Sequence, residues 1–205
     1  MTCTIRKLHF AAMAGVLSAS LLMPCTSAAQ TFELDSTKGL QPYDVTVEAV
    51  TYRGRKAVRV IPAADADAEL VAPKNGEGGG IVVLPGTSFH NGTIEVDFAG
   101  KPRAGATSDA RGFVGVAFRV AADPSKYECI YIRPTNGRAD DQVRRNHSTQ
   151  YISMPEYEWS RLRREAPGQY ESYVDLLPGE WTKIKIEVSG VEARLYVNDL
   201  HSPCW

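Results

Sequence analysis

The residue types best suited to ligand chemistry gather between positions 133 and 171. Arginine, asparagine, glutamine, tyrosine and tryptophan are frequent there, and lysine is absent. Arginine forks bind carboxylates and other planar polar groups in a two-pronged manner, and a saccharide needs a concave polar site with a few aromatic walls. We therefore predict a carbohydrate site in this stretch. The candidate ligand-binding residues are Arg133, Asn136, Arg138, Asp141, Arg144, Arg145, His147, Tyr151 and Trp159.

His147 is the single histidine of this stretch and the natural candidate for proton transfer. With Asp140, Asp141 or Glu171 beside it, it would act as a general base. We therefore name Asp141, His147 and Glu171 as candidate catalytic residues. Two structural alternatives stay open: His147 serves only as a hydrogen-bonding residue, or the whole stretch is a surface loop held by its own ion pairs.

The cysteines give no indication of a metal centre. Neither Cys129 nor Cys204 has a histidine or cysteine partner at ligand spacing. No metal site and no cofactor are predicted, and a structural calcium ion stays open. Cys129 lies in an apolar strand pattern, so a buried free thiol and a disulfide with Cys204 are both compatible with the sequence.

Charge and the start of the chain indicate where the protein works. Lys and Arg number 23 and Asp and Glu number 24, for a net charge of −1, which argues against a nucleic-acid partner. Arg6 and Lys7 precede an uncharged apolar run over 8–23, and small residues follow at 26–29. This pattern predicts a secretory signal peptide over 1–29. The mature domain, 30–205, is expected to be exported to the periplasm or the medium, without a transmembrane segment.

Several short segments have the pattern of strands that would carry this site. Period-two alternation and turn residues predict antiparallel strands joined largely by hairpins, and hence an all-β sandwich. Residues 62–80 and 99–111 are predicted loops. The predicted strands span residues 45–50, 57–61, 81–84, 92–98, 112–120, 127–133, 181–188 and 193–197.

One long insertion, 134–179, interrupts this pattern without strand periodicity. Ser153 and Glu156 fit a capping box, and Pro155 fits the first turn of a helix. We predict a short helix at about 155–165 there, ended by Pro167 and Gly168.

The order of these strands resembles a known fold. Residues 93–98, 112–119 and 127–133 resemble the middle of a concanavalin A-like jelly roll. Residues 179–188 and 193–198 are similar to the late hairpin of laminin-G-like and 3-keto-disaccharide hydrolase-like domains. The resemblance implies a jelly-roll sandwich over 30–205 and, by analogy, contact with glycans.

The resemblance also carries two further expectations. In such domains more strands follow the late hairpin, so we expect the sandwich to lack its last strands and to be poorly stable alone. Glu95 and Asp97 invite comparison with laminarinase-type glucanases, but Ala99 and Gly100 stand where the second catalytic glutamate would follow. We interpret Glu95 and Asp97 as the solvated face of a strand.

Three functions from different classes follow. The first is an exported carbohydrate-binding domain with its site in the 133–171 stretch. The second is a glycoside hydrolase or lyase of the same fold, and the third is a structural or adhesion module. Convergence of the candidate residues in one concavity would favour a site, and scatter over the surface would argue against it.

Overall fold

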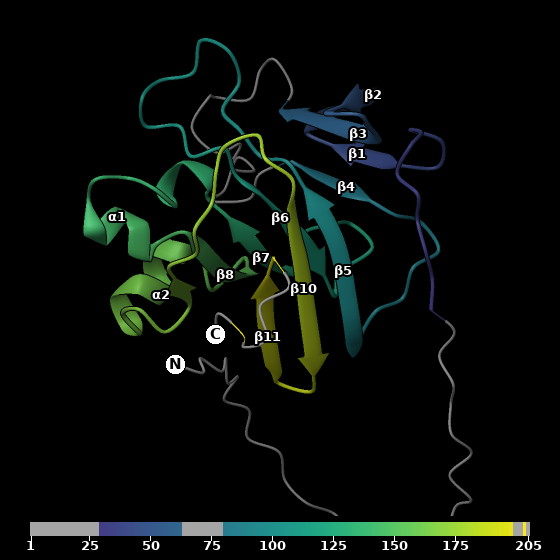
Figure 1. Cartoon of the computed structure of the whole chain (residues 1–205). Helices are drawn as coiled ribbons and strands as arrows, with labels where there is room; N and C mark the ends of the chain where they lie inside the picture. Colours follow the sequence, from purple (N-terminus) through teal and green to yellow (C-terminus); the bar gives the residue numbers. More distant parts are fainter. Residues whose placement is uncertain (1–28, 63–79, 199–202, 204–205) are drawn as a thin grey trace, which may run out of the picture.

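The protein is mainly β, with antiparallel sheets and two short α-helices (Figure 1). The computed structural model describes residues 29–62, 80–198 and 203. Almost all of the predicted signal peptide, most of the predicted loop 62–80 and Cys204 therefore lie outside the described residues. The described strands form four separate antiparallel sheets and no closed barrel. No helix in the described ranges has the length and apolar character to cross a membrane.

A three-stranded sheet has the order β11-β10-β5. Its strands are β5 (Gly92–Phe98), β10 (Thr182–Ser189) and β11 (Glu192–Val197). The predicted late hairpin is confirmed, because β10 and β11 pair in antiparallel register. Ile184, Ile186 and Val188 alternate with less buried residues along β10, which is the period-two pattern of a strand with one core face.

A four-stranded sheet has the order β6-β7-β8-β9. Its strands are β6 (Val114–Phe118), β7 (Tyr127–Ile132), β8 (Thr149–Met154) and β9 (Glu171–Ser172). The prediction that 134–179 contains no strand is wrong, because β8 pairs with β7 along its whole length. The insertion therefore supplies an interior strand of this sheet.

The burial of β8 explains why it shows no alternation. Nearly all of its residues are buried, including Thr149 and Gln150, so both faces of the strand are covered. The amide of Gln150 donates to the Tyr151 carbonyl at 2.9 Å, and the Thr149 hydroxyl lies 3.2 Å from that of Ser172. Buried polar side chains are tolerated when they are hydrogen-bonded in this way, and their presence hides the apolar pattern of a strand.

Three short helical segments lie in the insertion, at the side of the molecule away from β5 (Figure 1). They are the 3₁₀ turn η1 (Pro134–Asn136) and the helices α1 (Gln142–Asn146) and α2 (Trp159–Glu165). The predicted helix exists, but its predicted start is wrong. Backbone hydrogen bonds in both directions between Ser153 and Tyr157 close a turn around the cis Met154–Pro155 bond, so the helix begins only after Glu158.

Two further strand pairs come from the N-terminal part of the domain. They are β1 (Gln41–Tyr43) with β4 (Ile81–Val83), and β2 (Val45–Tyr52) with β3 (Arg55–Pro62). The predicted β2–β3 hairpin is confirmed, with Arg53 and Gly54 at φ 47° and 76°, as a tight two-residue hairpin requires. Its tip contacts the turn before β10, since the Tyr52 hydroxyl donates to the Gly179 carbonyl at 2.9 Å.

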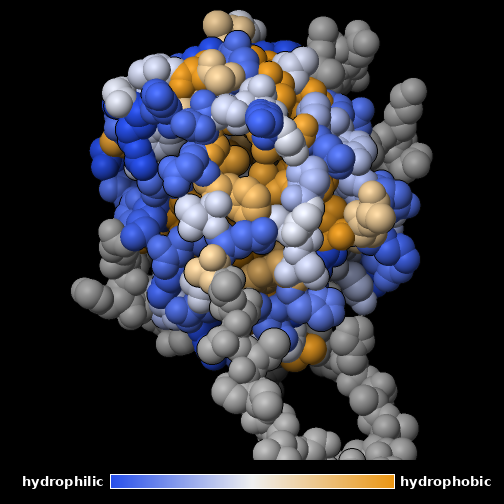
Figure 2. Space-filling view, turned by 90° about the vertical axis from the view of Figure 1, so that its right-hand side faces the viewer, coloured by the Kyte–Doolittle hydropathy of each residue, from blue (hydrophilic) through white to orange (hydrophobic). Residues whose placement is uncertain are grey.

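Burial differs sharply across the two larger sheets. Ile186 of β10 and Leu195 of β11 are fully buried, whereas Ile94 and Val96 of the edge strand β5 are only partly buried. The same decline runs from β8 to the edge strand β6. Figure 2, which views the molecule from the side of β5, shows an apolar hollow bordered by hydrophilic residues. The core is therefore tight at β10 and β11 and open toward β5 and β6.

Candidate functional site

One continuous cleft of about 3290 Å³ carries most of the predicted site residues. Its apolar part includes side chains of β5 and β6, and we call the end that the insertion residues line its polar part. Six of the nine candidate ligand-binding residues are part of the cleft lining. Those that line the cleft are Arg133, Asn136, Asp141, Arg144, His147 and Trp159.

The other three candidates are engaged elsewhere. Arg138 is exposed and donates two hydrogen bonds to the Asp175 carboxylate, at 2.7 and 2.9 Å. Arg145 donates to the Ala139 and Asp140 carbonyls and so stabilises the backbone before α1. Tyr151 is buried, and its hydroxyl donates to Glu128 at 2.8 Å. The structure therefore places these side chains outside the cleft lining.

The buried carboxylate of Glu171 binds the arginines beneath the polar part of the cleft. Glu171 is 5% exposed and accepts from Arg133 Nη1 at 3.2 Å and from Arg163 Nε at 3.0 Å. Burial alone would raise the pKa of Glu171, but the hydrogen bonds and charge of Arg163, with the favourable interactions of His147 and Arg133, outweigh burial and lower it. Glu171 is therefore an ionised anchor for arginines and a poor proton donor or acceptor.

The guanidinium of Arg133 donates hydrogen bonds to several residues of this buried group. Besides Glu171, its guanidinium donates to the Tyr131 hydroxyl and to Gln150 Oε1, each at 3.1 Å, and to the His147 carbonyl at 3.0 Å. Since Arg133 is 5% exposed, it positions its neighbours and offers little surface to a ligand.

His147 lies at the edge of the same group. Its Nδ1 is 2.8 Å from Oε2 of Glu171, but the two atoms do not meet hydrogen-bond geometry, so Nδ1 makes no hydrogen bond. Desolvation lowers the pKa of His147, the Glu171 charge opposes this, and Arg163 and Arg133 reinforce it. The imidazole is therefore neutral at pH 7, as a general base must be.

Arg144 has a different set of partners. Its Nε donates to Asn136 Oδ1 at 3.0 Å and its Nη2 to Thr135 Oγ1 at 3.1 Å. Asn136 is 2% exposed, and its amide donates to the His147 carbonyl at 2.9 Å, which orients the acceptor that Arg144 uses. Asp141 caps α1 by accepting from the Arg144 backbone, and these hydrogen bonds lower the pKa of Asp141. Asp141 is thus a structural cap.

Trp159 opens helix α2 and contributes the aromatic wall. The guanidinium of Arg163, one turn later, lies 4.6 Å from the centre of its ring, an attractive cation–π arrangement. The ring is therefore held in place by a side chain that is itself anchored on Glu171.

Arg163 and Arg111 line the cleft and are among the residues that the sequence reasoning did not predict. Arg163 follows Trp159 at helical i, i+4 spacing, a signal that predicts their contact once the helix is placed correctly. Arg111 belongs to the loop between β5 and β6, far from the insertion in sequence. No local pattern connects it with the insertion, because the contact depends on the Thr135 amide donating to the Arg111 carbonyl at 3.3 Å.

Metal-ligating residues do not gather in this cleft. No group of three or more His, Cys, Asp or Glu side chains with metal-binding geometry occurs among residues 29–62 and 80–198. Cys129 is a free thiol, and burial raises its pKa to about 12. A thiol of this kind is inert as a nucleophile at neutral pH.

Comparison of the chain with protein-family models, with curated proteins and with solved structures found no match.

Proposed function

We propose that this protein is an exported carbohydrate-binding domain whose ligand lies in the polar part of the cleft. The observation that carries the proposal is that Asn136, Arg144 and Trp159, from η1, α1 and α2, all line the same cleft. An aromatic wall beside oriented polar groups is the combination that sugar rings require. The resemblance to concanavalin A-like domains supports it, with the two larger sheets as the faces of a jelly-roll sandwich.

The size of the cleft favours an oligosaccharide over a single sugar. Typical small-molecule pockets measure about 300–1,000 Å³, and this cleft is about 3290 Å³. An extended chain of sugars would lie along the cleft, with one ring against Trp159 and its hydroxyls near Arg144 and Asn136.

A glycan array followed by calorimetry tests the proposal. We expect Trp159→Ala to weaken binding by about 2 kcal/mol, the usual cost of truncating an interface hot spot, while the protein stays folded. Tyr173→Ala is the matched control, because Tyr173 is 50% exposed and does not line the cleft. Equal binding by wild type and Trp159→Ala would contradict the proposed site, and binding to no glycan would favour a structural or adhesion module.

A second candidate function is a glycoside hydrolase or lyase that uses the same cleft. The specific observation in its favour is the neutral His147 beside the buried Glu171. In this scheme His147 accepts a proton from the sugar or from water, and Glu171 stabilises the resulting imidazolium. Release of reducing ends or unsaturated products, abolished by His147→Gln, would establish the enzyme, and intact glycans after prolonged incubation would favour binding alone.

A further inference from the structure

The arginines of the cleft fall into two classes by the charge of their partners. Arg133 and Arg163 both donate to the carboxylate of Glu171. Arg144 instead donates to the neutral oxygens of Asn136 and Thr135, and in the described part of the chain it forms no ion pair with a carboxylate. The guanidinium of Arg144 is therefore oriented by neutral groups, and its charge is offset only through space by Asp141, whose pKa it helps to lower.

Arg111 adds a second poorly neutralised charge beside it. Thr135 connects the two arginines, because its amide donates to the Arg111 carbonyl and its hydroxyl accepts from Arg144. The carboxylate nearest to Arg111 is that of Asp109, which is 3.9 Å away and 85% exposed, so solvent screens it strongly. Burial lowers the pKa of Arg111, and the charges of Arg144 and Arg133 lower it further. The two arginines repel each other in the free protein.

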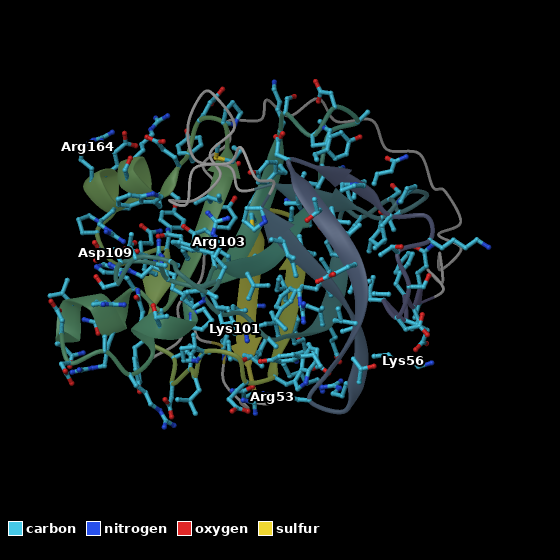
Figure 3. All side chains as sticks on the ribbon, turned by 90° about the horizontal axis from the view of Figure 1, so that it is seen from above. Arg53, Lys56, Lys101, Arg103, Asp109 and Arg164 are labelled. Atoms are coloured by element: carbon cyan, nitrogen blue, oxygen red, sulfur yellow. The ribbon has the colours of Figure 1, made fainter. Side chains whose placement is uncertain are left out.

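The loop between β5 and β6, which carries Arg111, contains two further basic residues. Seen from above, Lys101 and Arg103 lie near the middle of the molecule, whereas Arg164 lies at its outer edge (Figure 3). Lys101 and Arg103 also line the cleft, where basic side chains outnumber acidic ones. The whole chain has a net charge of only −1, so the cleft lining as a whole has an excess of positive charge. A cleft with an excess of one sign of charge attracts ligands of the opposite sign.

We propose that Arg111 and Arg144 bind a sugar carboxylate, which makes the ligand an oligosaccharide that contains uronic acids. This inference rests on the proposed function and specifies its ligand class. A carboxylate fits because a guanidinium presents parallel N–H donors at the spacing of two carboxylate oxygens. The Arg144 Nη1 makes no hydrogen bond to the described residues and is the available donor. Bound carboxylate would also relieve the repulsion between the two arginines.

The test compares each acidic ligand with its own neutral form. Oligogalacturonates and oligomannuronates are titrated into the wild-type protein, alongside the same oligosaccharides after reduction of the carboxyl groups to alcohols. We expect the acidic forms to bind at least about tenfold more tightly, because hydrogen bonds to a charged group are at stake. Added salt should weaken only the acidic forms.

Variants then assign the effect to the two arginines. Arg144→Met and, independently, Arg111→Met should each remove most of the preference for the acidic form. Arg138→Met is the matched control, because Arg138 is exposed and paired with Asp175 outside the cleft lining. Arg111→Met keeps the test decisive if Arg144→Met does not fold, and the comparison of acidic and reduced ligands needs no variant.

The outcomes separate this inference from the proposed function. Equal affinity for acidic and reduced oligosaccharides would overturn the inference and leave a carbohydrate-binding domain. Tighter binding of sulfated oligosaccharides than of uronates, or an unchanged preference in both arginine variants, would also overturn it. Binding of no saccharide at all would overturn both.

Discussion

The two sides of the molecule differ in how completely their apolar residues are covered. On the side of β10, β11, β7 and β8, Ile130, Ile186 and Leu195 are almost completely buried. On the side of β5 and β6, the apolar residues that point to the same face of their sheet stay partly exposed, and they line the cleft. The closed side therefore carries most of the stability, and the open side contributes the apolar part of the cleft.

The largest expected effect concerns the charged network around Glu171, beneath the polar part of the cleft. Glu171→Gln keeps the shape of the side chain but leaves the buried Arg133 without its anionic partner. Breaking a buried pair in this way costs about 3–5 kcal/mol. Denaturant unfolding measures the loss, and Glu165→Gln serves as the control. Glu165 pairs with Arg161 on the surface, so its loss should change stability little, and similar stabilities of the two variants would contradict the anchoring role of Glu171.

A pair of isoleucines tests the difference between the sides directly. Ile186 of β10 and Ile94 of β5 face each other in register within one sheet, yet Ile186 is 0% exposed and Ile94 is partly buried. Ile186→Ala should cost about 2–5 kcal/mol because it leaves a cavity in a packed core. Ile94→Ala should cost about 1 kcal/mol, since only part of its surface leaves water on folding. Equal free energies of unfolding for the two variants would mean that the open side is covered in solution.

The smallest expected effect is a dependence of stability on pH. The folded protein lowers the pKa of His147 below its ordinary 6.5 and that of Glu171 below its ordinary 4.5. The unfolded chain then binds more protons than the folded protein, so stability falls on acidification. The contribution of His147 is complete above pH 6.5 and is lost as the pH falls toward its folded pKa; that of Glu171 is lost below pH 4.5 by the same argument. Thermal melts at pH 7.5 and 5.5 should show a decrease in Tm that His147→Gln reduces, and an identical decrease in that variant would exclude His147 as the source.

The sequence predicts strands well where only one face is buried. Ile94, Val96 and Phe98 in β5, and Ile184, Ile186 and Val188 in β10, occur at every second position, and both strands are found as predicted. Thr149, Gln150 and Tyr151 in β8 are all buried on a strand with two covered faces. No period-two pattern exists there, which is why this strand escaped prediction.

At the start of α2, a local helix signal and the tertiary pairing of β8 favoured different structures. Ser153 and Glu156 match a capping box, but Ser153 bonds to Tyr157 as part of a turn after β8. Tertiary pairing of β8 thus prevails over a local helix signal. For the site, the arginine-rich stretch supplies part of the cleft lining, whereas Arg111 could not be found because its position depends on a contact across the chain.

The burial of β8 has a consequence for hydrogen exchange. Ser148, Thr149 and Gln150 are 0% exposed, and they lie directly after His147 and next to Arg133. Amides in such a strand exchange with solvent mainly through global unfolding, whereas short surface helices open locally at little cost in free energy. The backbone under the cleft should therefore be among the slowest to exchange even without ligand. Ligand-dependent protection should then appear in α1 and α2, while the amides of β8 change only as far as the ligand stabilises the whole fold.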